Sequence, residues 1–419
     1  MTITGTARRL LSGPPLRGGP ESLTEHLTRL GPVPTGFAAR RAIGELETAG
    51  ILGRGGAGFP LGRKWRAIAE RVAEGGPPAV VVANGAEGEP ASAKDQVLME
   101  RRPHLVIDGA VVAADAIGAD EIVFYVGREH TAAVAAMSDA LAVRTAGIRT
   151  RVTLVEAPIG YVAGEATAVV HYVNARDARP VTTPPRMSER GVDGRPTLVQ
   201  NVESLAYAAL IARHGAAWYR SAGRLDTRGT ALVTLSGPVR EPGVREIELG
   251  TPLGDVVAEA GGVTAAVSAV LLGGYFGTWA APADVWAMPL DPAVMRERDL
   301  AFGCGIIGLQ PATQCGLAAT TRIIRFLADA SARQCGPCTY GLPAMAEAME
   351  RISIGAARDD DPDNLERWTA MVAGRGACSH PDGAAQHLES ALAVFADDVA
   401  SHVDQRWCLA TGGRAGGAR

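Results

Sequence analysis

The segment with the clearest chemical character is the glycine-rich loop GRGGAGFPLGRKW, residues 53–65. Four glycines fall within six residues of it: Gly53, Gly55, Gly56 and Gly58. Residues without a Cβ let backbone N–H groups approach a ligand closely, and Arg54 and Lys64 bring positive charge to the same place. The loop indicates binding of a phosphate-bearing ligand, with a purely structural turn as the competing interpretation.

Three of these glycines match G-x-G-x-x-G, the fingerprint of dinucleotide-binding folds. That fingerprint has to follow a β-strand, whereas the preceding residues, AARRAIGELETAG, have the pattern of a helix that ends at Gly50. An ordinary dinucleotide-binding loop is therefore not favoured.

A second candidate site is the Cys-x-x-Cys formed by Cys335 and Cys338. Six cysteines in 419 residues do not make a disulfide framework, and a Cys-x-x-Cys in the cytosol is typical of metal or redox chemistry. For Cys304 and Cys315 the favoured interpretation is a small buried hydrophobic side chain. Cys408 falls in the C-terminal tail and is assigned no role.

The elements that must position these residues follow from the apolar pattern. Strand-like runs alternate with Ala-rich helical stretches, the strands at 79–83, 122–126 and 152–155 and the helices at 97–118 and 129–146. This alternation predicts a parallel sheet covered by helices. Beyond about residue 229 the pattern predicts a small α+β unit, and beyond about residue 300 it is mainly helical.

The composition excludes several classes of function. Acidic and basic residues are mixed along the chain and the net charge is −4, so no basic face is available for nucleic acid. No apolar run reaches the ~18 to 20 residues that cross a bilayer, and no signal-peptide-like stretch opens the sequence. We expect a cytoplasmic protein, peripheral to a membrane complex at most, with no nucleic-acid partner and no direct membrane insertion.

Four further segments accompany the glycine-rich loop in order: VVANGAEGEPASAKDQVLM (81–99), IGYVAGEATA (159–168), PTLVQNVESLA (196–206) and SGPVREPGVREIELGTPL (236–253). Together the five resemble the NADH-binding flavoprotein subunit of respiratory complex I and the diaphorase subunits of related hydrogenases and formate dehydrogenases. The likeness covers roughly residues 37–395, and the chain reads as a divergent member.

The resemblance implies that the loop holds flavin mononucleotide (FMN). It assigns to the phosphate and ring surroundings Gly53, Arg54, Gly55, Gly56 and Lys64, and it completes the pocket with Asn84, Glu87, Tyr161, Gly164, Glu165 and Asn201. Amides and a cation suit a phosphate, and Asn and Glu side chains can bond ribityl hydroxyls and ring heteroatoms. No residue is assigned acid–base catalysis.

The half of the site that would hold the nicotinamide nucleotide departs from the family. Phe59 is kept as an aromatic for stacking, but other family positions are changed, with Ala67, Ala86, Ala166, Thr183, Arg186 and Gln200 in place of aromatic, acidic, basic or Asn residues. One lost stacking ring removes about 0.5 to 1.5 kcal/mol, and several losses are not neutral. Two alternatives stay open. In one, Arg186 stacks on adenine through its guanidinium plane or pairs with the 2′-phosphate of NADPH, which shifts the nucleotide preference; in the other, the site no longer binds a nicotinamide nucleotide.

The family also carries C-G-x-C-x-P-C and one distant Cys as ligands to a [4Fe-4S] cluster. Cys335, Cys338 and Cys378 match three of these ligands, whereas Ala332 stands at the first position. Four outcomes stay open: a four-iron cluster with another ligand such as His380 or Cys304, a three-iron cluster, zinc, or an empty site.

The implied fold is α/β with three parts. A Rossmann-like flavin domain is followed by a β-grasp domain of the SLBB type and a C-terminal helical bundle. The expected boundaries are a flexible arm at 1–21, the flavin and nucleotide domain at 22–228, the β-grasp domain at 229–298, the helical iron-sulfur domain at 299–400 and a tail at 401–419.

The implied function is that of an NADH dehydrogenase (diaphorase)-type oxidoreductase. Hydride from NAD(P)H would reach FMN, and single electrons would leave through the iron-sulfur centre to a ferredoxin-like or thioredoxin-like iron-sulfur partner. Two alternatives remain. One is an FMN and iron-sulfur subunit that serves ferredoxin-like partners without binding NADH; the other is a non-catalytic structural subunit with a three-cysteine metal site.

Overall fold

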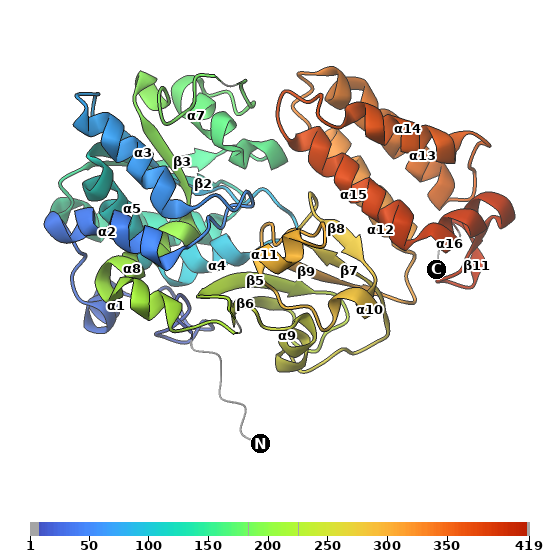
Figure 1. Ribbon diagram of the computed structural model, residues 1–419, viewed down its shortest axis with the longest axis horizontal. Helices are drawn as coiled ribbons and strands as arrows, with labels where there is room; N and C mark the ends of the chain where they lie inside the picture. Colours follow the sequence, from blue (N-terminus) through green and yellow to red (C-terminus); the bar gives the residue numbers. More distant parts are fainter. Residues whose placement is uncertain (1–7, 183, 225, 417–419) are drawn as a thin grey trace. The chain divides into compact units, whose positions relative to one another are not determined.

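A computed structural model describes residues 8–182, 184–224 and 226–416 of the chain (Figure 1). It divides into two compact units. The first holds the described residues up to Val233 together with Val244–Thr251, and the second holds Thr234–Gly243 and the described residues from Pro252 onward. Thr183, the first seven residues of the predicted arm and the last three of the predicted tail lie outside the described residues.

The first unit is built on a parallel sheet with the strand order β3-β2-β1-β4. Its strands are β1 (Ala79–Gly85), β2 (Ala119–Gly127), β3 (Arg151–Ala157) and β4 (Thr197–Asn201). The predicted runs at 79–83, 122–126 and 152–155 all lie inside these strands. Along β1, Val81 and Ala83 face one hydrophobic core while Val80 and Val82 face another, as the two-residue period of a strand requires.

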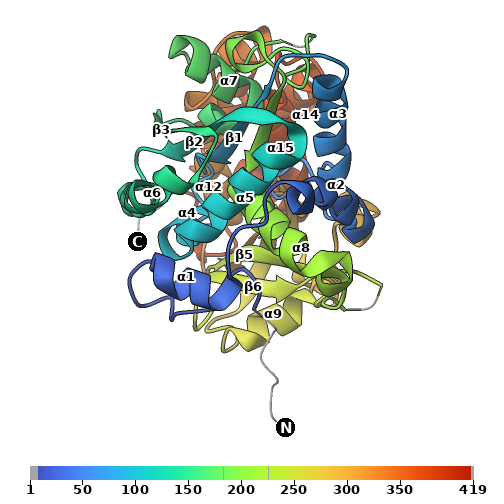
Figure 2. The ribbon, with the colours of Figure 1, turned by 90° about the vertical axis from the view of Figure 1, so that its left-hand side faces the viewer.

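Helices cover both faces of this sheet. The first core receives α2 (Phe37–Ala49), α3 (Leu61–Ala73), α5 (Pro103–Ile117), α6 (Thr131–Arg144) and α8 (Val202–Arg220), several of which are seen in Figure 2. The second core receives α7 (Ala166–Ala175). The remaining helices of the unit are α1 (Leu23–Leu30), α4 (Lys94–Arg101) and the 3-10 turns η1 (Thr145–Gly147), η2 (Tyr161–Gly164) and η3 (Val192–Gly194).

The N-terminal segment corrects one expectation. A capping box of Ser22 and Glu25 begins α1, and the preceding residues, predicted as a flexible arm, are packed where the structure describes them. Leu10 and Leu11 are buried, and the backbone N–H groups of Arg9, Leu10 and Leu11 donate to the Glu246 carboxylate at 2.9–3.1 Å. The Gly/Pro-rich composition gave no sign of this distant carboxylate.

The second unit contains a mixed sheet and a helical bundle. Within the unit, the last residues of β5 (Thr230–Ser236) pair in parallel with β9 (Ile306–Pro311), which is antiparallel to β7 (Val267–Leu272), and β7 pairs with β8 (Thr278–Ala280). Short helices α9 (Leu253–Glu259), α10 (Pro282–Val285) and α11 (Pro292–Arg296) accompany it, and β6 (Gly243–Glu248) falls mostly in the first unit. The sheet therefore continues past the predicted boundary at residue 298, because β9 is a short apolar run that the sequence pattern merged with the helical region.

The helical part is a four-helix bundle. Helices α12 (Gly316–Asp329) and α14 (Asp361–Val372) each pack against α13 (Leu342–Ser353) and α15 (His380–Val394), and a π-helix, η4 (Pro337–Gly341), leads into α13. The chain continues through α16 (Ala396–Ala400) and a second π-helix, η5 (Ser401–Gln405), into a small hairpin of β10 (Trp407–Cys408) and β11 (Gly413–Arg414). The described part of the predicted tail is thus structured. Over the described ranges, no helix has the length and apolarity to cross a membrane.

Candidate cofactor sites

The first candidate site lies at the carboxyl edge of the parallel sheet. Asn84 near the end of β1 and Asn201 at the end of β4 are register partners, so their side chains emerge at the same edge. The glycine-rich loop packs directly on this edge. A Cβ placed on Gly55 would lie 3.2 Å from the Asn201 Cβ, which leaves little room for any other residue. Carboxyl edges of parallel sheets are the usual place for nucleotide-like ligands.

The loop has a backbone shape that suits close approach to a ligand. It begins after α2, as predicted, and it is closed by the Gly53 N–H, which donates to the Phe59 carbonyl at 2.9 Å. Gly56 and Gly58 have φ values of +101° and +62°, a region that side chains with a Cβ rarely adopt. Residues 55–57, in the middle of the loop, are exposed. Their amides can therefore face an incoming phosphate.

Lys64 supplies the positive charge of this site. It lies in the first turn of α3, and its ammonium donates to the Val199 carbonyl of β4 at 2.5 Å. No carboxylate among the described residues pairs with it, and desolvation lowers the pKa of Lys64 to about 8. A partly desolvated ammonium without a counter-ion fits an anionic ligand bound beside it.

Gln200 is a site residue that the predicted set left out. It is buried, its Nε2 lies 3.9 Å from the position of a Cβ on Gly53, and its Oε1 has no hydrogen-bond partner among the described residues. An unsatisfied buried amide oxygen costs about 1–3 kcal/mol, so a ligand or water that bonds to it is favoured. The sequence signal was its place next to Asn201, at a position where the family has Asn.

Asn84 connects β1 to the segment that follows β3. Its amide Nδ2 donates to the Gly164 carbonyl at 2.9 Å, and its Oδ1 accepts the Ala86 N–H at 3.3 Å. Nearby, the Tyr161 hydroxyl donates to the buried Glu89 carboxylate at 3.0 Å. Asn84 and Gly164 are therefore brought together by a hydrogen bond, and Tyr161 lies in the same 3-10 turn as Gly164.

Three other predicted residues cap helices. Glu165 accepts the Thr167 and Ala168 N–H groups at the start of α7, at 2.8 and 3.1 Å. Asn201 accepts the N–H groups of the first turn of α8, at 3.0 and 3.4 Å. Glu87 accepts the N–H groups of Asp95 and Gln96 at the start of α4, at 3.0 and 2.7 Å. These side chains hold three helix N-termini at one sheet edge, which favours anions there.

The Glu87 carboxyl is the most perturbed of the three. Burial and the neighbouring Asp95 carboxylate raise the pKa of Glu87 to about 7. The backbone of Glu87 is in the left-handed region, with φ of +42°. Since the sequence expectation was a carboxylate that bonds the ribityl chain, the structure adds that this carboxylate is already engaged with α4 and the Ser92 hydroxyl.

A buried charge network joins α4 to α8. Lys94 donates to Asp95 at 2.7 Å and pairs with Glu203 at 3.0 Å, while the Asn201 amide donates to Asp95 at 2.6 Å. Burial acts against the charged form of Lys94, but Asp95 and Glu203 outweigh it and raise the pKa of Lys94. This network holds the Asn201 amide in place through Asp95.

Arg54 lies differently from what the charge of the loop predicted. Its guanidinium is buried and donates to the Tyr219 hydroxyl at 3.2 Å and the Thr230 carbonyl at 3.1 Å, with Glu203 3.9 Å away. Its backbone N–H donates to the Ser204 hydroxyl at 2.9 Å. The Arg54 side chain thus anchors the loop from inside, and Lys64 remains the cation at the ligand side.

The positions tied to a nicotinamide nucleotide carry small or flexible side chains. Phe59 is 53% exposed, as a stacking surface requires, and Arg186 is exposed too. Ala86 is buried, Ala166 is half-buried and Ala67 is exposed. The structure therefore leaves Phe59 as the exposed aromatic of the glycine-rich loop, with no acidic side chain at residues 86 and 166.

The second candidate site is in the helical bundle. Cys335 precedes η4, Cys338 lies within it and Cys378 precedes α15. Burial and the neighbouring Cys335 and Cys378 thiols raise the pKa of Cys338 to about 12, so the three thiols are neighbours. In the described structure their sulfurs are not all within 4.8 Å of one another, as one shared ion would need. A cluster, whose thiolates bind different irons, fits this wider spacing better.

The structure places the residue at the missing ligand position and one candidate to replace that ligand. Ala332 lies in the loop between α12 and η4 and offers no ligand atom. His380, a candidate for the fourth ligand, is buried, with its Nε2 2.7 Å from the Leu327 carbonyl and its ring 5.4 Å from that of Phe276. The pattern of residues around Cys378 gave no sign of this packing.

Comparisons with known proteins agree with both sites. Three family models match the chain: the Nuo51 FMN-binding domain over residues 46–209, the SLBB domain over 232–278 and the NADH-ubiquinone oxidoreductase-F iron-sulfur binding region over 318–402. The first contains every predicted flavin-site residue, and the last contains Cys335, Cys338 and Cys378.

Relatives that match over most of their length belong to the same family as these models. The second F subunit of NADH-quinone oxidoreductase in Rhizobium meliloti (strain 1021) is 32% identical over 395 residues, which are 88% of this chain and 93% of the relative. The NADH-quinone oxidoreductase F subunit of Rhodobacter capsulatus is 30% identical, over 87% of this chain and 88% of the relative.

Among solved structures, an NAD+-reducing [NiFe]-hydrogenase in the H2-reduced state matches with a TM-score of 0.81 and 29% identity. This chain is covered over 90% of its length and spans 66% of the hydrogenase chain. The air-oxidized state matches with a TM-score of 0.83 and 28% identity.

These findings confirm the predicted resemblance, the α/β fold with its SLBB and helical parts, and the assignment to the NADH dehydrogenase-type oxidoreductases with FMN-binding and iron-sulfur-binding regions. The relatives are named as subunits of NADH-quinone oxidoreductase. The chain belongs to the family of the NADH-quinone oxidoreductase F subunits.

Proposed function

We propose that this chain is the electron-entry subunit of a larger complex, in which it oxidises NAD(P)H with FMN and passes the electrons through an iron-sulfur centre to a partner. The observation that supports it most directly is the carboxyl edge of the parallel sheet. There, an unpaired and desolvated Lys64, an unsatisfied Gln200 amide and an exposed glycine-rich loop lie together.

The residues divide into those that would contact FMN and those that support them. The backbone of Gly53, Gly55 and Gly56 and the ammonium of Lys64 would hold the phosphate. The side chains suited to the ribityl chain and ring are Asn84, Tyr161, Gln200 and Asn201, with Gly164 leaving space for them. Bound FMN supplies the conversion of a two-electron hydride donor into single electrons.

The supporting residues act through the backbone. Glu87 and Glu165 cap α4 and α7, and Arg54 fastens the loop to Tyr219 and Thr230. In this proposal none of the three touches the cofactor through its side chain. Their removal would therefore weaken FMN binding indirectly, together with the stability of the first unit.

Phe59 is the residue proposed to stack on the nicotinamide nucleotide, because it is an exposed ring on the loop that holds the phosphate. Arg186, also exposed, suits a 2′-phosphate, which NADPH has and NADH lacks. We therefore propose that NADPH competes with NADH at this site.

The iron-sulfur centre is proposed to be held by Cys335, Cys338 and Cys378. With no fourth cysteine at residue 332, a three-iron cluster or a four-iron cluster completed by a non-cysteine ligand fits the donor set. The partner would be a ferredoxin-like or thioredoxin-like iron-sulfur subunit, and the location cytoplasmic. The predicted domain boundaries belong to this proposal too, except that the β-grasp part is extended to include β9.

The test is an anaerobic absorbance and EPR titration of the purified chain with NADH, NADPH and dithionite, with flavin and iron quantified per chain. Bleaching of the flavin band by NADH or NADPH, followed by an EPR signal from the cluster, is the expected result. A yellow protein that only dithionite bleaches would remove the nicotinamide nucleotide from the proposal. A protein that neither carries nor takes up FMN would overturn it.

A further inference from the structure

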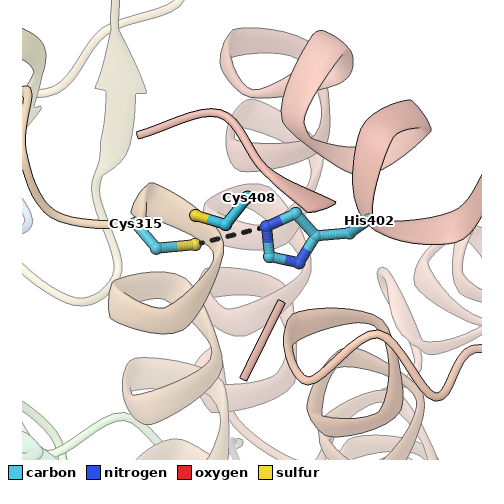
Figure 3. A group of neighbouring side chains, drawn as sticks. All are labelled: Cys315, His402 and Cys408. Atoms are coloured by element: carbon cyan, nitrogen blue, oxygen red, sulfur yellow. Dashed lines mark hydrogen bonds between the residues drawn. The ribbon is translucent and has the colours of Figure 1, made fainter. Parts of the chain in front are cut away.

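The second unit holds a set of metal-ligating side chains apart from the three predicted cysteines. They are Cys315, His402 and Cys408, and Figure 3 shows the two thiols and the imidazole turned toward one another. One ligand atom from each lies within 4.8 Å of the other two. Cys315 and His402 are 87 residues apart and belong to different elements, so no local sequence motif predicts that they meet.

The imidazole of His402 is held in the way that metal-binding histidines usually are. It is 1% exposed, and its Nδ1 lies 3.1 Å from the Ile352 carbonyl. A carbonyl can only accept, so Nδ1 carries the proton and Nε2 presents its lone pair. That lone pair points at the Cys315 Sγ, 3.7 Å away (Figure 3). A backbone carbonyl on the far nitrogen is the common outer-shell partner of a ligating His.

The two thiols are also placed for binding as thiolates. Cys315 is the N-cap of α12, a helix of 14 residues, and its Sγ accepts the Ala318 N–H at 3.4 Å. Burial and the neighbouring Cys408 raise the pKa of the Cys315 thiol to about 11 when no metal is bound, while the bond from the Ala318 N–H acts in the opposite direction. A bound metal ion adds the positive charge that favours the thiolate. Cys408 is 2% exposed in β10, where the hairpin with β11 pairs it with Gly413 and fixes its position.

The spacing matches one small ion with tetrahedral geometry. With Zn–S of about 2.3 Å and Zn–N of about 2.0–2.1 Å, a tetrahedral site puts sulfur and nitrogen about 3.6 Å apart. The separation of Cys315 Sγ and His402 Nε2 is 3.7 Å. Two sulfurs and one imidazole form a donor set that zinc prefers over calcium, magnesium or manganese.

One further polar group lies beside the set. The Oδ1 of Asp398 in α16 is buried without a hydrogen-bond partner among the described residues, and its carboxylate is near enough to His402 to interact with it electrostatically. It is not among the ligand atoms within 4.8 Å. A water in the fourth position of a tetrahedral ion would give this oxygen a donor.

We propose that Cys315, His402 and Cys408 form a structural zinc site, completed by a water that donates to Asp398. The ion ties the C-terminal hairpin to the start of α12, with no part in electron transfer. The site is independent of the proposed flavin and iron-sulfur chemistry, and it binds zinc whether or not the chain oxidises NAD(P)H.

The test is a metal analysis of the purified full-length protein and four variants. Cys408→Ser and His402→Ala should each lower zinc from about one per chain to near zero while iron is unchanged. Cys335→Ser should do the reverse, losing iron and keeping zinc. Cys304→Ser should keep zinc, because Cys304 is not among the three zinc ligands. Zinc that persists in Cys408→Ser, or a wild-type protein with iron but no zinc, overturns the proposal.

Two measurements on the unmodified protein keep the test decisive if a variant fails to fold. Zinc-edge X-ray absorption should give a first shell of two sulfurs and two nitrogen or oxygen atoms, and a shell of three or four sulfurs would assign zinc to other cysteines. Thiol titration after denaturation with a chelator should count Cys315 and Cys408 as free. A disulfide between them would overturn the site.

Discussion

At the scale of single residues, the flavin site is marked by polar groups that lack a partner within the described chain. The Lys64 ammonium has only a carbonyl to bond, and the Gln200 Oε1 has nothing. Both would gain from a bound anion with hydrogen-bonding oxygens. The Glu87 carboxylate and the Arg54 Nη2 group, in contrast, already bond groups of the protein, so charge alone is a poor guide to which residues touch the ligand.

Lys64 predicts a pH dependence of FMN binding. Its folded pKa of about 8 is below its ordinary value, so the unliganded site loses the proton above about pH 8, while the bound phosphate favours the protonated form. The dissociation constant of FMN should therefore be flat below about pH 8 and rise by up to about tenfold per pH unit above it. Fluorescence titrations of the apoprotein with FMN between pH 6.5 and 9.5, in steps of about 0.5 pH unit, measure how the dissociation constant changes with pH.

Lys64→Arg is the matched control for this prediction. A guanidinium keeps its charge across the range, so the slope above pH 8 should disappear even if the affinity is lower throughout. An unchanged slope in Lys64→Arg would assign the titration to another group. In the unliganded protein the same lowered pKa makes this residue's contribution to stability rise with pH between the folded and unfolded values, opposite in sign to its effect on binding.

Gly55 predicts a steric effect at the same site. A Cβ there would lie 3.2 Å from the Asn201 Cβ, so Gly55→Ala should push the loop off β4 by a few tenths of an ångström and weaken FMN binding by about tenfold, or ~1.4 kcal/mol. Equilibrium dialysis of FMN measures it. Gly44→Ala on α2, where an added Cβ meets nothing within 4 Å, should leave affinity unchanged.

At the scale of elements, the site is a meeting point of helix N-termini. Helices α4, α7 and α8 each start at the carboxyl edge of the sheet, and each is capped by a residue that the family resemblance assigns to the pocket. The caps explain why Asn and Glu recur there without each contacting a ligand. They satisfy backbone N–H groups that would otherwise lack a partner.

Glu165→Ala tests this supporting role. Loss of the cap on α7 should cost about 1 kcal/mol of stability, which lowers the unfolding temperature by about 2–4 °C for a unit of this size. Calorimetry with and without FMN is the measurement. If Glu165 acts only as a cap, Glu165→Asp should restore most of the stability and the FMN affinity together. Glu74→Ala, at an exposed position after α3, serves as the neutral comparison.

The elements also show where sequence reasoning succeeded and where it could not. The strands β1 to β3 were predictable because Val- and Ile-rich runs between Ala-rich helices have one stable arrangement, and the cap at Ser22 has a local signature. Strand β9 was missed because its six residues do not alternate between apolar and polar, so the sequence pattern does not separate it from the helical region that follows. The anchoring of Leu10 and the grouping of Cys315 with His402 depend on residues far away in sequence, which no local pattern encodes.

At the scale of the whole molecule, the chain carries its proposed cofactors in different units: FMN in the first, the cluster and the zinc ion in the second. A substitution at one of these sites should therefore change the occupancy of that site and leave the others occupied. The bundle has three of the four cysteines that the family uses as cluster ligands. A substitution that supplies the fourth cysteine should therefore change the iron content of the protein.

Ala332→Cys tests that incompleteness. A thiol at this position of the motif should raise iron toward about four per chain and increase the absorbance of the cluster, with FMN content unchanged. Iron analysis of anaerobically purified protein and EPR of the reduced state measure it. Ala330→Cys, two residues away at the end of α12, should have no such effect. Equal iron in both variants and wild type would contradict the alignment of Ala332 with the first ligand.

The scarcity of lysine has a practical consequence. Of 41 Lys and Arg residues only Lys64 and Lys94 are lysines, and Lys94 is 2% exposed. A reagent that acylates amines therefore finds, besides an α-amino group, essentially one side chain to attack, and it is the one at the proposed FMN phosphate. The acylation rate followed by mass spectrometry would report occupancy of that pocket without any engineered label.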